Sequence, residues 1–344
     1  MTTPAAPFHE SGPLGTPIRD LGLTLAGSSL EPILGEFAGE LERAGLRKIR
    51  PRFYLSTEWG VPEGTVAIAI PFYLARPDLT ALHAHHVGHV EGIGRADILR
   101  YLRHEMGHVV NYGYELFADP EWAGLFGPIS APYREDYRPE PFSRRHVRHL
   151  PGWYAQKHPD EDWSETFAVW MTPGLDWRAE YADWPVALAK LQYCDRTMTA
   201  LGDRDPVVTA NDLDEDVGDL DYSLDHFYRG LAQAEEPYPV ALDSALRAVF
   251  EDLDDLREHA DPGQPHALAS ALIPRMEGNL ARSVYQWTGH FPERTRSLVR
   301  HLAHRAEILV LLYPEAGEAR AVIALTTLVT ALATNFVREN RYLP

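Results

Sequence analysis

The chain has 344 residues, of which 45% are hydrophobic and 24% charged, and its formal net charge is −18 at pH 7. This length predicts two domains, or one domain with a substantial addition. The negative charge argues against nucleic acid as the main partner, because DNA and RNA binding needs a cationic surface. Cys194 is the only cysteine, so an internal disulfide is excluded and a reducing cytoplasm is favoured. We find neither a signal peptide nor an apolar run of the roughly 18 residues that a membrane span needs, and therefore expect no membrane partner.

The first part of the chain predicts an arm, a helix and two strands. Residues 1–17 are rich in Pro, Gly and Thr, which is typical of a loose N-terminal arm. Residues 30–45 carry apolar side chains at helical spacing and end at a glycine, so they predict an amphipathic helix. The runs 52–56 and 65–74 have the composition of strands, and turn residues separate them.

Two further helices are predicted, with a long loop between them. The first runs from about 96 to 117, where Asp119-Pro120 ends it. Residues 118–152 show no sustained period, and loops of this length often line a functional site. The second helix covers 159–171, and the acidic residues 160–162 favour the positive end of its dipole.

The C-terminal part predicts helices without a chemical motif. Residues 201–236 are acidic and predict a solvent-facing connector. We expect an all-α domain over 237–344, with four helices at 241–258, 267–287, 292–312 and 315–340. These helices could form an oligomer, recruit substrate or cover a cleft, and the residues do not separate these roles.

The predicted helix at 96–117 carries the sequence His104-Glu105-Met106-Gly107-His108. Two histidines four residues apart lie on one face of a helix, where both imidazoles can bind one zinc ion. Glu105 is then placed to accept a proton from a zinc-activated water. The motif could arise by chance among 16 histidines, but the apolar residues of this helix lie on the opposite face, which argues against chance.

A catalytic zinc site needs a third protein ligand, and the helix at 159–171 offers Glu165. Trp163, Phe167 and Trp170 form the apolar stripe of that helix. Glu165 lies about 200° from Phe167 around the helix axis, so it faces away from the stripe. The alternative is a glutamate on the protein surface.

The two segments together resemble a known family of zinc-binding metallopeptidases, which are gluzincin-type zincins. The matching residues are the His-Glu-x-Gly-His motif and, further along, Tyr154-Ala155-x-x-His158-Pro159-x-Glu161-Asp162-Trp163-x-Glu165-Thr166-Phe167-Ala168. The layout also resembles the catalytic domain of anthrax lethal factor, in which a helix bearing the third ligand follows the zinc helix after an insertion. The resemblance covers roughly residues 95–172.

This resemblance implies an α+β zincin-like catalytic domain over 18–200, with a short sheet beside the metal helix. It also implies that Glu105 is the general base and that Glu165 is the third zinc ligand. The chain departs from the family at position 169, where Val replaces the common aspartate four residues beyond the ligand glutamate. The orientation of the histidines is therefore unresolved at this stage.

A zincin also needs a donor to the oxyanion that develops on the substrate. Tyr154 is our first candidate because it lies in the matched motif, and a packed phenol is the alternative. His158 is the second candidate. Three weaker ones lie on the long loop, namely Tyr133, Tyr137 and His149.

The function we expect is that of a cytoplasmic zinc metallopeptidase acting on a peptide or protein. A zinc hydrolase of a non-peptide amide is one alternative, and a regulatory or binding protein with a vestigial zincin site is the other. An extended substrate could pair with the edge of the strand at 65–74, or that strand could be buried.

Two smaller clusters have alternative interpretations. His83, His85, His86 and His89 could bind a second metal ion, although ordinary loop or surface residues explain them more simply. The basic stretch 144–149 could bind a substrate carboxylate or form a solvated loop.

Overall fold

The computed structural model describes residues 13–344 with the exception of 88–89, 134–136, 138, 141, 235–237, 240, 254–263, 340 and 344. The chain divides into two compact units. The first unit comprises Met1–Ala131 and Pro159–Glu236, and the second comprises Pro132–His158 and Pro237–Pro344. Residues 132–158, which the sequence places in the catalytic domain, therefore cluster with the C-terminal helices instead.

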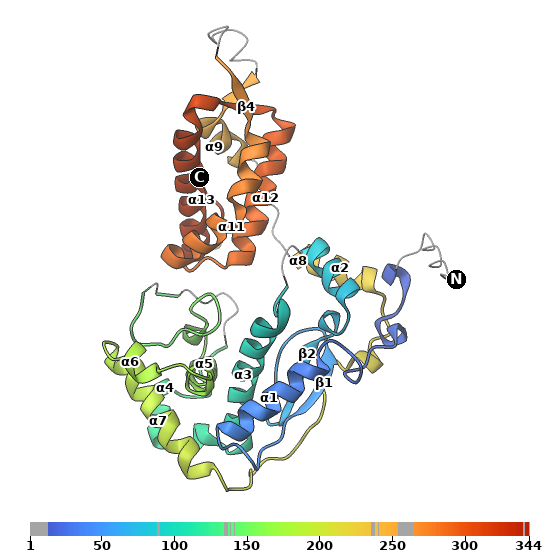
Figure 1. Cartoon of the computed structure of the whole chain (residues 1–344), viewed down its shortest axis with the longest axis vertical. Helices are drawn as coiled ribbons and strands as arrows, with labels where there is room; N and C mark the ends of the chain where they lie inside the picture. The colour runs from blue at the N-terminus through green and yellow to red at the C-terminus, as the bar shows by residue number, and fades with distance from the viewer. Residues whose placement is uncertain are drawn as a thin grey trace. The chain divides into compact units, whose positions relative to one another are not determined.

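The first unit combines helices with one small sheet, as the α+β prediction requires (Figure 1). Its strands form a parallel pair in the order β1-β2. Its elements are α1 (Glu31–Arg43), β1 (Arg52–Ser56), β2 (Ala67–Pro71), α2 (Pro77–Val87), α3 (Gly94–Gly113), α4 (Pro120–Phe126), α5 (Pro159–Met171), α6 (Trp177–Glu180), α7 (Pro185–Leu201) and α8 (Leu224–Ala234). The predictions of α1, β1, α3 and α5 are confirmed. The short helix α4 was not predicted, and it lies within the segment 118–152 that was expected to be a loop.

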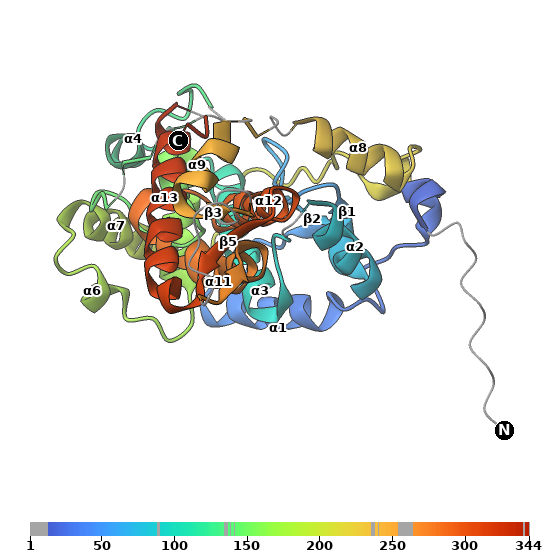
Figure 2. The same cartoon turned by 90° about the horizontal axis from the view of Figure 1, so that it is seen from above.

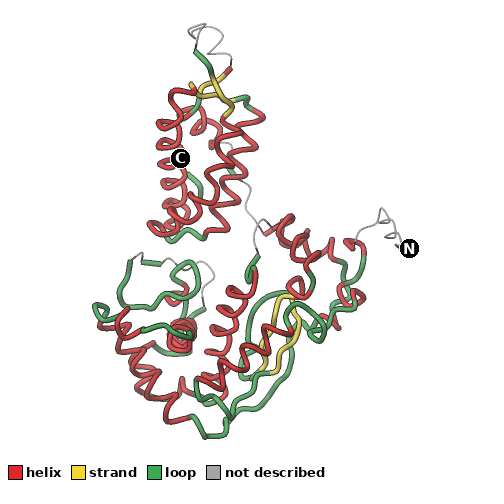
Figure 3. Tube along the Cα trace, in the orientation of Figure 1, coloured by secondary structure: helices red, strands yellow, loops and turns green. Residues whose placement is uncertain are grey.

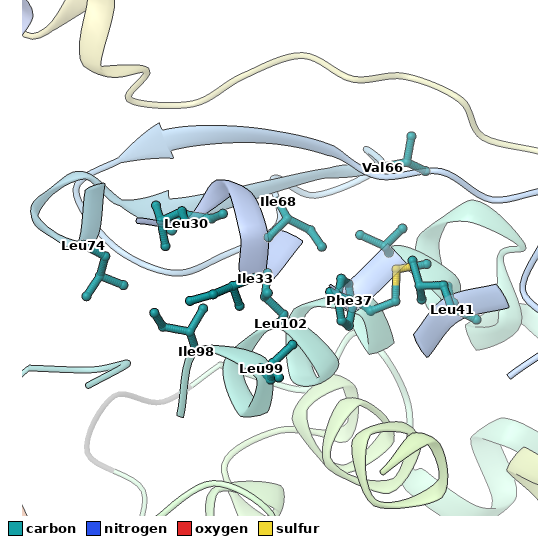
Figure 4. Packing of buried hydrophobic residues seen from close by; sticks show 14 of the residues in the cluster. Leu30, Ile33, Phe37, Leu41, Val66, Ile68, Leu74, Ile98, Leu99 and Leu102 are labelled. Atoms are coloured by element: carbon teal, nitrogen blue, oxygen red, sulfur yellow. The ribbon is translucent and has the colours of Figure 1, made fainter. Parts of the chain in front are cut away.

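The core of the first unit lies between the sheet, α1 and α3 (Figure 4). Phe37 of α1, Ile68 of β2 and Leu102 of α3 are fully buried and point toward one another. Arg103 of α3 donates two hydrogen bonds of 2.8 Å to the buried Glu40 of α1. The apolar face of α3 is thus covered by α1 and the sheet, and this arrangement orients its opposite face toward α5.

The predicted strand at 65–74 is shorter in the structure. It ends at Pro71, and a 3-10 turn follows over Phe72–Ala75. All five residues of β2 are buried. One edge of β2 pairs with β1, and on the other edge the amide of Ala69 donates to the carbonyl of Gly60 over 2.8 Å. The structure therefore favours the buried-strand alternative over an open edge for substrate.

The acidic connector differs from its prediction. Its carboxylates are largely exposed, but its apolar residues Val217 and Leu220 are buried in the core of the first unit. The amide of Val66 donates to the carbonyl of Ala210 over 2.7 Å. The connector therefore packs on the first unit, because its few apolar side chains are buried in the core of that unit. Its acidic composition alone does not predict this burial.

Residues 13–17, the described part of the predicted N-terminal arm, have a defined structure. Pro13–Gly15 forms a 3-10 turn, and Pro17 bridges to Ser223. The remaining positions of the predicted arm, 1–12, lie outside the described residues.

The second unit is a helical bundle with a short sheet (Figures 2 and 3). Its main helices are α9 (Ala241–Val249), α11 (Ala269–Thr288), α12 (Pro292–Ile308) and α13 (Glu318–Glu339). Three antiparallel strands, in the order β3-β5-β4, are β3 (Glu251–Asp252), β4 (His266–Leu268) and β5 (Leu311–Pro314). The prediction of an all-α region is therefore wrong. Val310 has a φ of 49°, a left-handed turn that separates α12 from β5.

Helix α13 is more apolar than our reading of the sequence recognised. Over Glu315–Glu339 it is long and apolar enough to cross a membrane, by length and composition only, which corrects the expectation of no such run. In the structure, 28% of that apolar window is buried. Leu325, Val329 and Leu332 are fully buried within the apolar cluster that α13 shares with α11 and α12.

Candidate metal centre

The candidate site forms where α3 and α5 pack closely. A Cβ atom on Gly107 would lie 2.6 Å from the Cα of Ser164, so only glycine allows this separation of the two backbones. The indole of Trp163 donates a 2.8 Å hydrogen bond to the carbonyl of Gly107. These two contacts fix α5 against the turn of α3 that carries the histidines.

Three potential ligand atoms converge at this interface. Nε2 of His104 lies 3.2 Å from Nε2 of His108, and Oε2 of Glu161 lies 3.0 and 3.3 Å from these two nitrogens. All three residues are buried. Zinc–ligand distances near 2.0–2.1 Å in a tetrahedral arrangement place the ligand atoms about 3.3 Å apart. The triangle therefore has the size and the donor chemistry to hold a metal ion with three protein ligands.

The other ring nitrogen of each histidine faces a carboxylate. Nδ1 of His104 lies 2.9 Å from Oε1 of Glu165, and Nδ1 of His108 lies 2.9 Å from Oδ2 of Asp160. A hydrogen bond from Nδ1–H to a carboxylate leaves the Nε2 lone pair available for a metal ion. The structure thus supplies the orientation of the histidines that the sequence left unresolved.

The third candidate ligand in the structure differs from the predicted Glu165. The residue beside both Nε2 atoms is Glu161, whereas Glu165 contacts the far side of the His104 ring. The two glutamates are four residues apart and share one face of α5, so periodicity alone does not separate them. With Glu161 as the ligand, Glu165 is the carboxylate four residues beyond it, which is where the resembling family has its aspartate.

The carboxylates of the cluster favour positive charge on the two histidines. Burial lowers the pKa of His104, but its hydrogen bonds to the carboxylates of Glu161 and Glu165 outweigh burial and raise that pKa to about 9. Burial raises the pKa of Glu161 and of Asp160, but the charge of His108 outweighs it and both values are lowered. A divalent cation is therefore suited to replace the protons on the two imidazoles.

Glu105 lies beside the ligand triangle and is 5% exposed. Burial raises the pKa of its carboxyl, while His104 and His108 act to lower it. A glutamate with a raised pKa is better suited to accept and then release a proton. The position and the environment of Glu105 both fit the predicted general base.

The three acids at the start of α5 were interpreted as partners of the helix dipole, but the structure gives each one a specific contact. Asp160 and Glu161 contact the histidines, and Asp162 accepts a 2.5 Å hydrogen bond from Lys190 of α7. Burial raises the pKa of Asp162 to about 7, with Lys190 opposing the shift. The sequence contains a signal for these contacts. Three consecutive acids stand before the apolar stripe that begins at Trp163, and acidic side chains on a buried helix need partners.

The candidate oxyanion donors lie in the second unit. The ring of Tyr154 contacts that of Tyr137 at 6.4 Å, and its hydroxyl accepts a 3.4 Å hydrogen bond from Lys157. The rings of Tyr133 and His158 are 5.3 Å apart. The role of Tyr154 in stabilising an oxyanion stays a prediction, as does that of the weaker candidates, among them His149.

The predicted histidine cluster at 83–89 is a set of stacked rings. His83 stacks on Tyr73 at 3.6 Å, and His86 stacks on Tyr228 at 4.4 Å. His89 lies outside the described residues. In the part of the chain that the structure describes, the one group of three closely spaced metal-ligating side chains is that of His104, His108 and Glu161.

Comparison with known proteins returns no match: no family model, no curated protein and no solved structure is similar to the chain. The resemblance to zincins therefore depends on the motif residues themselves.

Proposed function

We propose that this chain is a zinc-dependent metallopeptidase that hydrolyses a peptide or protein amide bond. The observation that carries the proposal is the convergence of two imidazole nitrogens and one carboxylate oxygen within 3.3 Å of one another, beside the buried Glu105. Metal sites that serve only a structural role use four protein ligands and need no adjacent carboxylate. Three ligands and a buried base support a catalytic site.

His104, His108 and Glu161 would hold the ion, and Glu165 and Asp160 would orient the imidazoles. Two imidazoles and a carboxylate are a common ligand set for catalytic zinc. When bound, zinc acidifies a water molecule and polarises the carbonyl of the scissile bond. The remaining chemistry belongs to the side chains of the chain.

Glu105 accepts the proton of the attacking water and then delivers it to the leaving amine. The proton passes from water to one carboxylate oxygen while the water oxygen forms a bond to the carbonyl carbon of the substrate. The C–N bond then breaks, the amine leaves with that proton, and the acyl part leaves as a carboxylate. Burial favours both steps, because the raised pKa of Glu105 reduces the cost of holding the proton between them. Tyr154 remains our proposed donor to the oxyanion.

We also propose a zincin-like fold for the first unit. Its support is the helix α3, which bears the motif and has the β1-β2 sheet and α1 on its apolar side, together with α5, which bears the third ligand. The reducing cytoplasm remains our proposed location, since the buried Cys194 is the only cysteine.

The test is peptide turnover by the purified full-length chain. We expect a mixed peptide library to be cleaved, the cleavage to stop with a chelator, and zinc to restore it. Glu105→Gln should lower turnover by on the order of 10²–10⁴-fold while zinc stays bound. The control is Glu180→Gln, at an exposed position on α6, which should have no effect. Full turnover in Glu105→Gln would contradict the mechanism.

Two other outcomes would redirect the proposal. Cleavage of small amides without cleavage of peptides would favour a hydrolase of non-peptide amides. Tight zinc binding without any turnover would favour the vestigial, regulatory alternative.

A further inference from the structure

Asp160, the second residue of α5, receives three hydrogen bonds from α3. Its Oδ2 lies 2.9 Å from Nδ1 of His108 and accepts a 2.6 Å bond from the hydroxyl of Tyr112. Its Oδ1 accepts a 2.6 Å bond from the amide of Asn111. Both oxygens are therefore engaged, and neither can rotate without the loss of a bond.

The three donors come from one face of α3. His108, Asn111 and Tyr112 are separated by three and four residues, which is the spacing at which helical side chains meet a common partner. Asp160 is 6% exposed, and a carboxylate at that depth is costly unless it is fully hydrogen-bonded.

We propose that Asp160, held by Asn111 and Tyr112, is a positioning residue that fixes the ring of His108 for metal binding. This inference rests on the metal site of the proposed function. The bond to Asp160 keeps the proton on Nδ1 and directs Nε2 toward Glu161 and Nε2 of His104. Asn111 and Tyr112 act through Asp160, because they fix the orientation of its carboxylate plane.

Position on the helix does not explain this arrangement. An acid in the first turn stabilises a helix through its dipole when its carboxylate lies near the free backbone amides. Asp160 instead contacts side chains of α3. The adjacent Asp162 provides a contrast, because it pairs with Lys190 of α7 and ties two helices together. The two neighbouring aspartates therefore have different roles, which their variants can separate.

The test measures zinc affinity by competition with a chelator, alongside thermal unfolding of the zinc-free protein. Asp160→Asn should weaken zinc binding by about 10–100-fold, the range found when such outer partners are removed. Tyr112→Phe should cause a smaller loss, and it should add nothing in the Asp160→Asn background, because both act on the same ring. In nitrogen-15 spectra, His108 of the zinc-loaded wild type should carry its proton on Nδ1 with a charge-assisted hydrogen bond, which Asp160→Asn should weaken because it removes the negative charge of the acceptor.

Two matched controls separate positioning from stability. Asp162→Asn should lower the unfolding temperature without a change in the zinc dissociation constant. Tyr114→Phe removes the hydroxyl of the residue that directly follows α3, which donates to the carbonyl of Arg204 over 2.9 Å, and should leave zinc affinity unchanged.

The proposal is overturned if Asp160→Asn loses stability but binds zinc as tightly as the wild type. If Asp160→Asn does not fold, Tyr112→Phe decides, and zinc affinity equal to that of Tyr114→Phe overturns the proposal. Zinc affinity that depends on Asp160 in a protein without amidase activity would sustain the positioning role and reject the proposed function. A wild-type chain without zinc affinity would reject both.

Discussion

Two helix pairs in this molecule bury their interfaces in opposite ways. In the second unit, α11 and α12 pack through aliphatic side chains such as Leu272, Val284 and Leu302, which are at most 1% exposed. In the first unit, the interface between α3 and α5 buries two histidines and several carboxylates in addition to its apolar residues. Helical geometry is common to both pairs, but the chemistry of the buried face differs.

The two interfaces differ in how burial contributes to the free energy of unfolding. Burying aliphatic groups contributes about 25 cal/mol per Å² of apolar surface, with no requirement for a particular partner. Burying a carboxylate is unfavourable unless charges and hydrogen bonds compensate it. The α3/α5 interface buries four such carboxylates, each of which needs compensation, at Glu105, Asp160, Glu161 and Glu165. Clusters of this kind are typical of functional sites.

The largest expected effect separates the two glutamates of α5. Glu161→Ala removes a ligand and should weaken zinc binding by more than about 100-fold, beyond the range of an outer partner. Glu165→Gln removes only a partner of His104 and should cost about 10–100-fold. Competition with a chelator measures both. The reverse order would restore Glu165 as the ligand and contradict the geometry described above.

A substitution in the apolar core of the second unit, to which α13 also contributes, should affect stability alone. Leu325→Ala removes a fully buried side chain from α13 and should lower the free energy of unfolding by about 2–5 kcal/mol. Ile323→Ala, at a position that is 67% exposed, should change it by less than about 0.5 kcal/mol. Urea unfolding provides the comparison. Zinc affinity should be the same in both variants, and a loss of affinity in Leu325→Ala would end the distinction between the apolar core of the second unit and the α3/α5 interface.

Gly107→Ala should disturb both packing and metal binding. The added methyl group meets the backbone of Ser164 at 2.6 Å, and such overpacking costs about 1–3 kcal/mol. Because α5 must move away, Glu161 should leave the histidines and zinc affinity should fall. Gly35→Ala in α1 has no atom within 4 Å of the new methyl group and should slightly increase stability. Unchanged zinc affinity in Gly107→Ala would show that the close approach is not required.

The smallest effect concerns acid sensitivity of the second unit. Burial, with Arg294 nearby, lowers the pKa of His290 from 6.5 to about 3. The unfolded chain therefore binds a proton that the folded chain excludes, so stability is complete above pH 6.5 and is lost as the pH falls toward 3. This group should account for about 1 kcal/mol between pH 7 and pH 5.5.

Urea unfolding at those two pH values measures the effect. His290→Gln should remove this part of the pH dependence, whereas His304→Gln, at an exposed position, should not. An identical slope for the wild type and His290→Gln would show that His290 is not the group responsible.

Much of the fold could be predicted from the sequence. The helix at α5 and the strand β1 have the predicted bounds, because Pro159 fixes a helix start and a β-rich run between turns fixes a strand. The short sheet of the second unit could not be predicted. Its three strands have two to four residues each, and long-range pairing rather than local preference forms them.

The candidate site was only partly predictable for a related reason. His104, Glu105 and His108 follow from spacing along one helix. The choice between Glu161 and Glu165 depends on how far α5 slides along α3, which Gly107 and Ser164 determine through contact. The roles of Asn111 and Tyr112 depend on the same contact, and no local pattern reveals them.

The central claim is that the α3/α5 interface binds one catalytic zinc ion, and zinc titration of the purified full-length chain tests it most directly. The account predicts one ion per chain and stabilisation against unfolding of about 4 kcal/mol when free zinc is 1,000 times the dissociation constant. Both should be absent in the double variant His104→Ala/His108→Ala. A wild-type chain that binds no zinc, or binds it equally well without these histidines, would contradict the account.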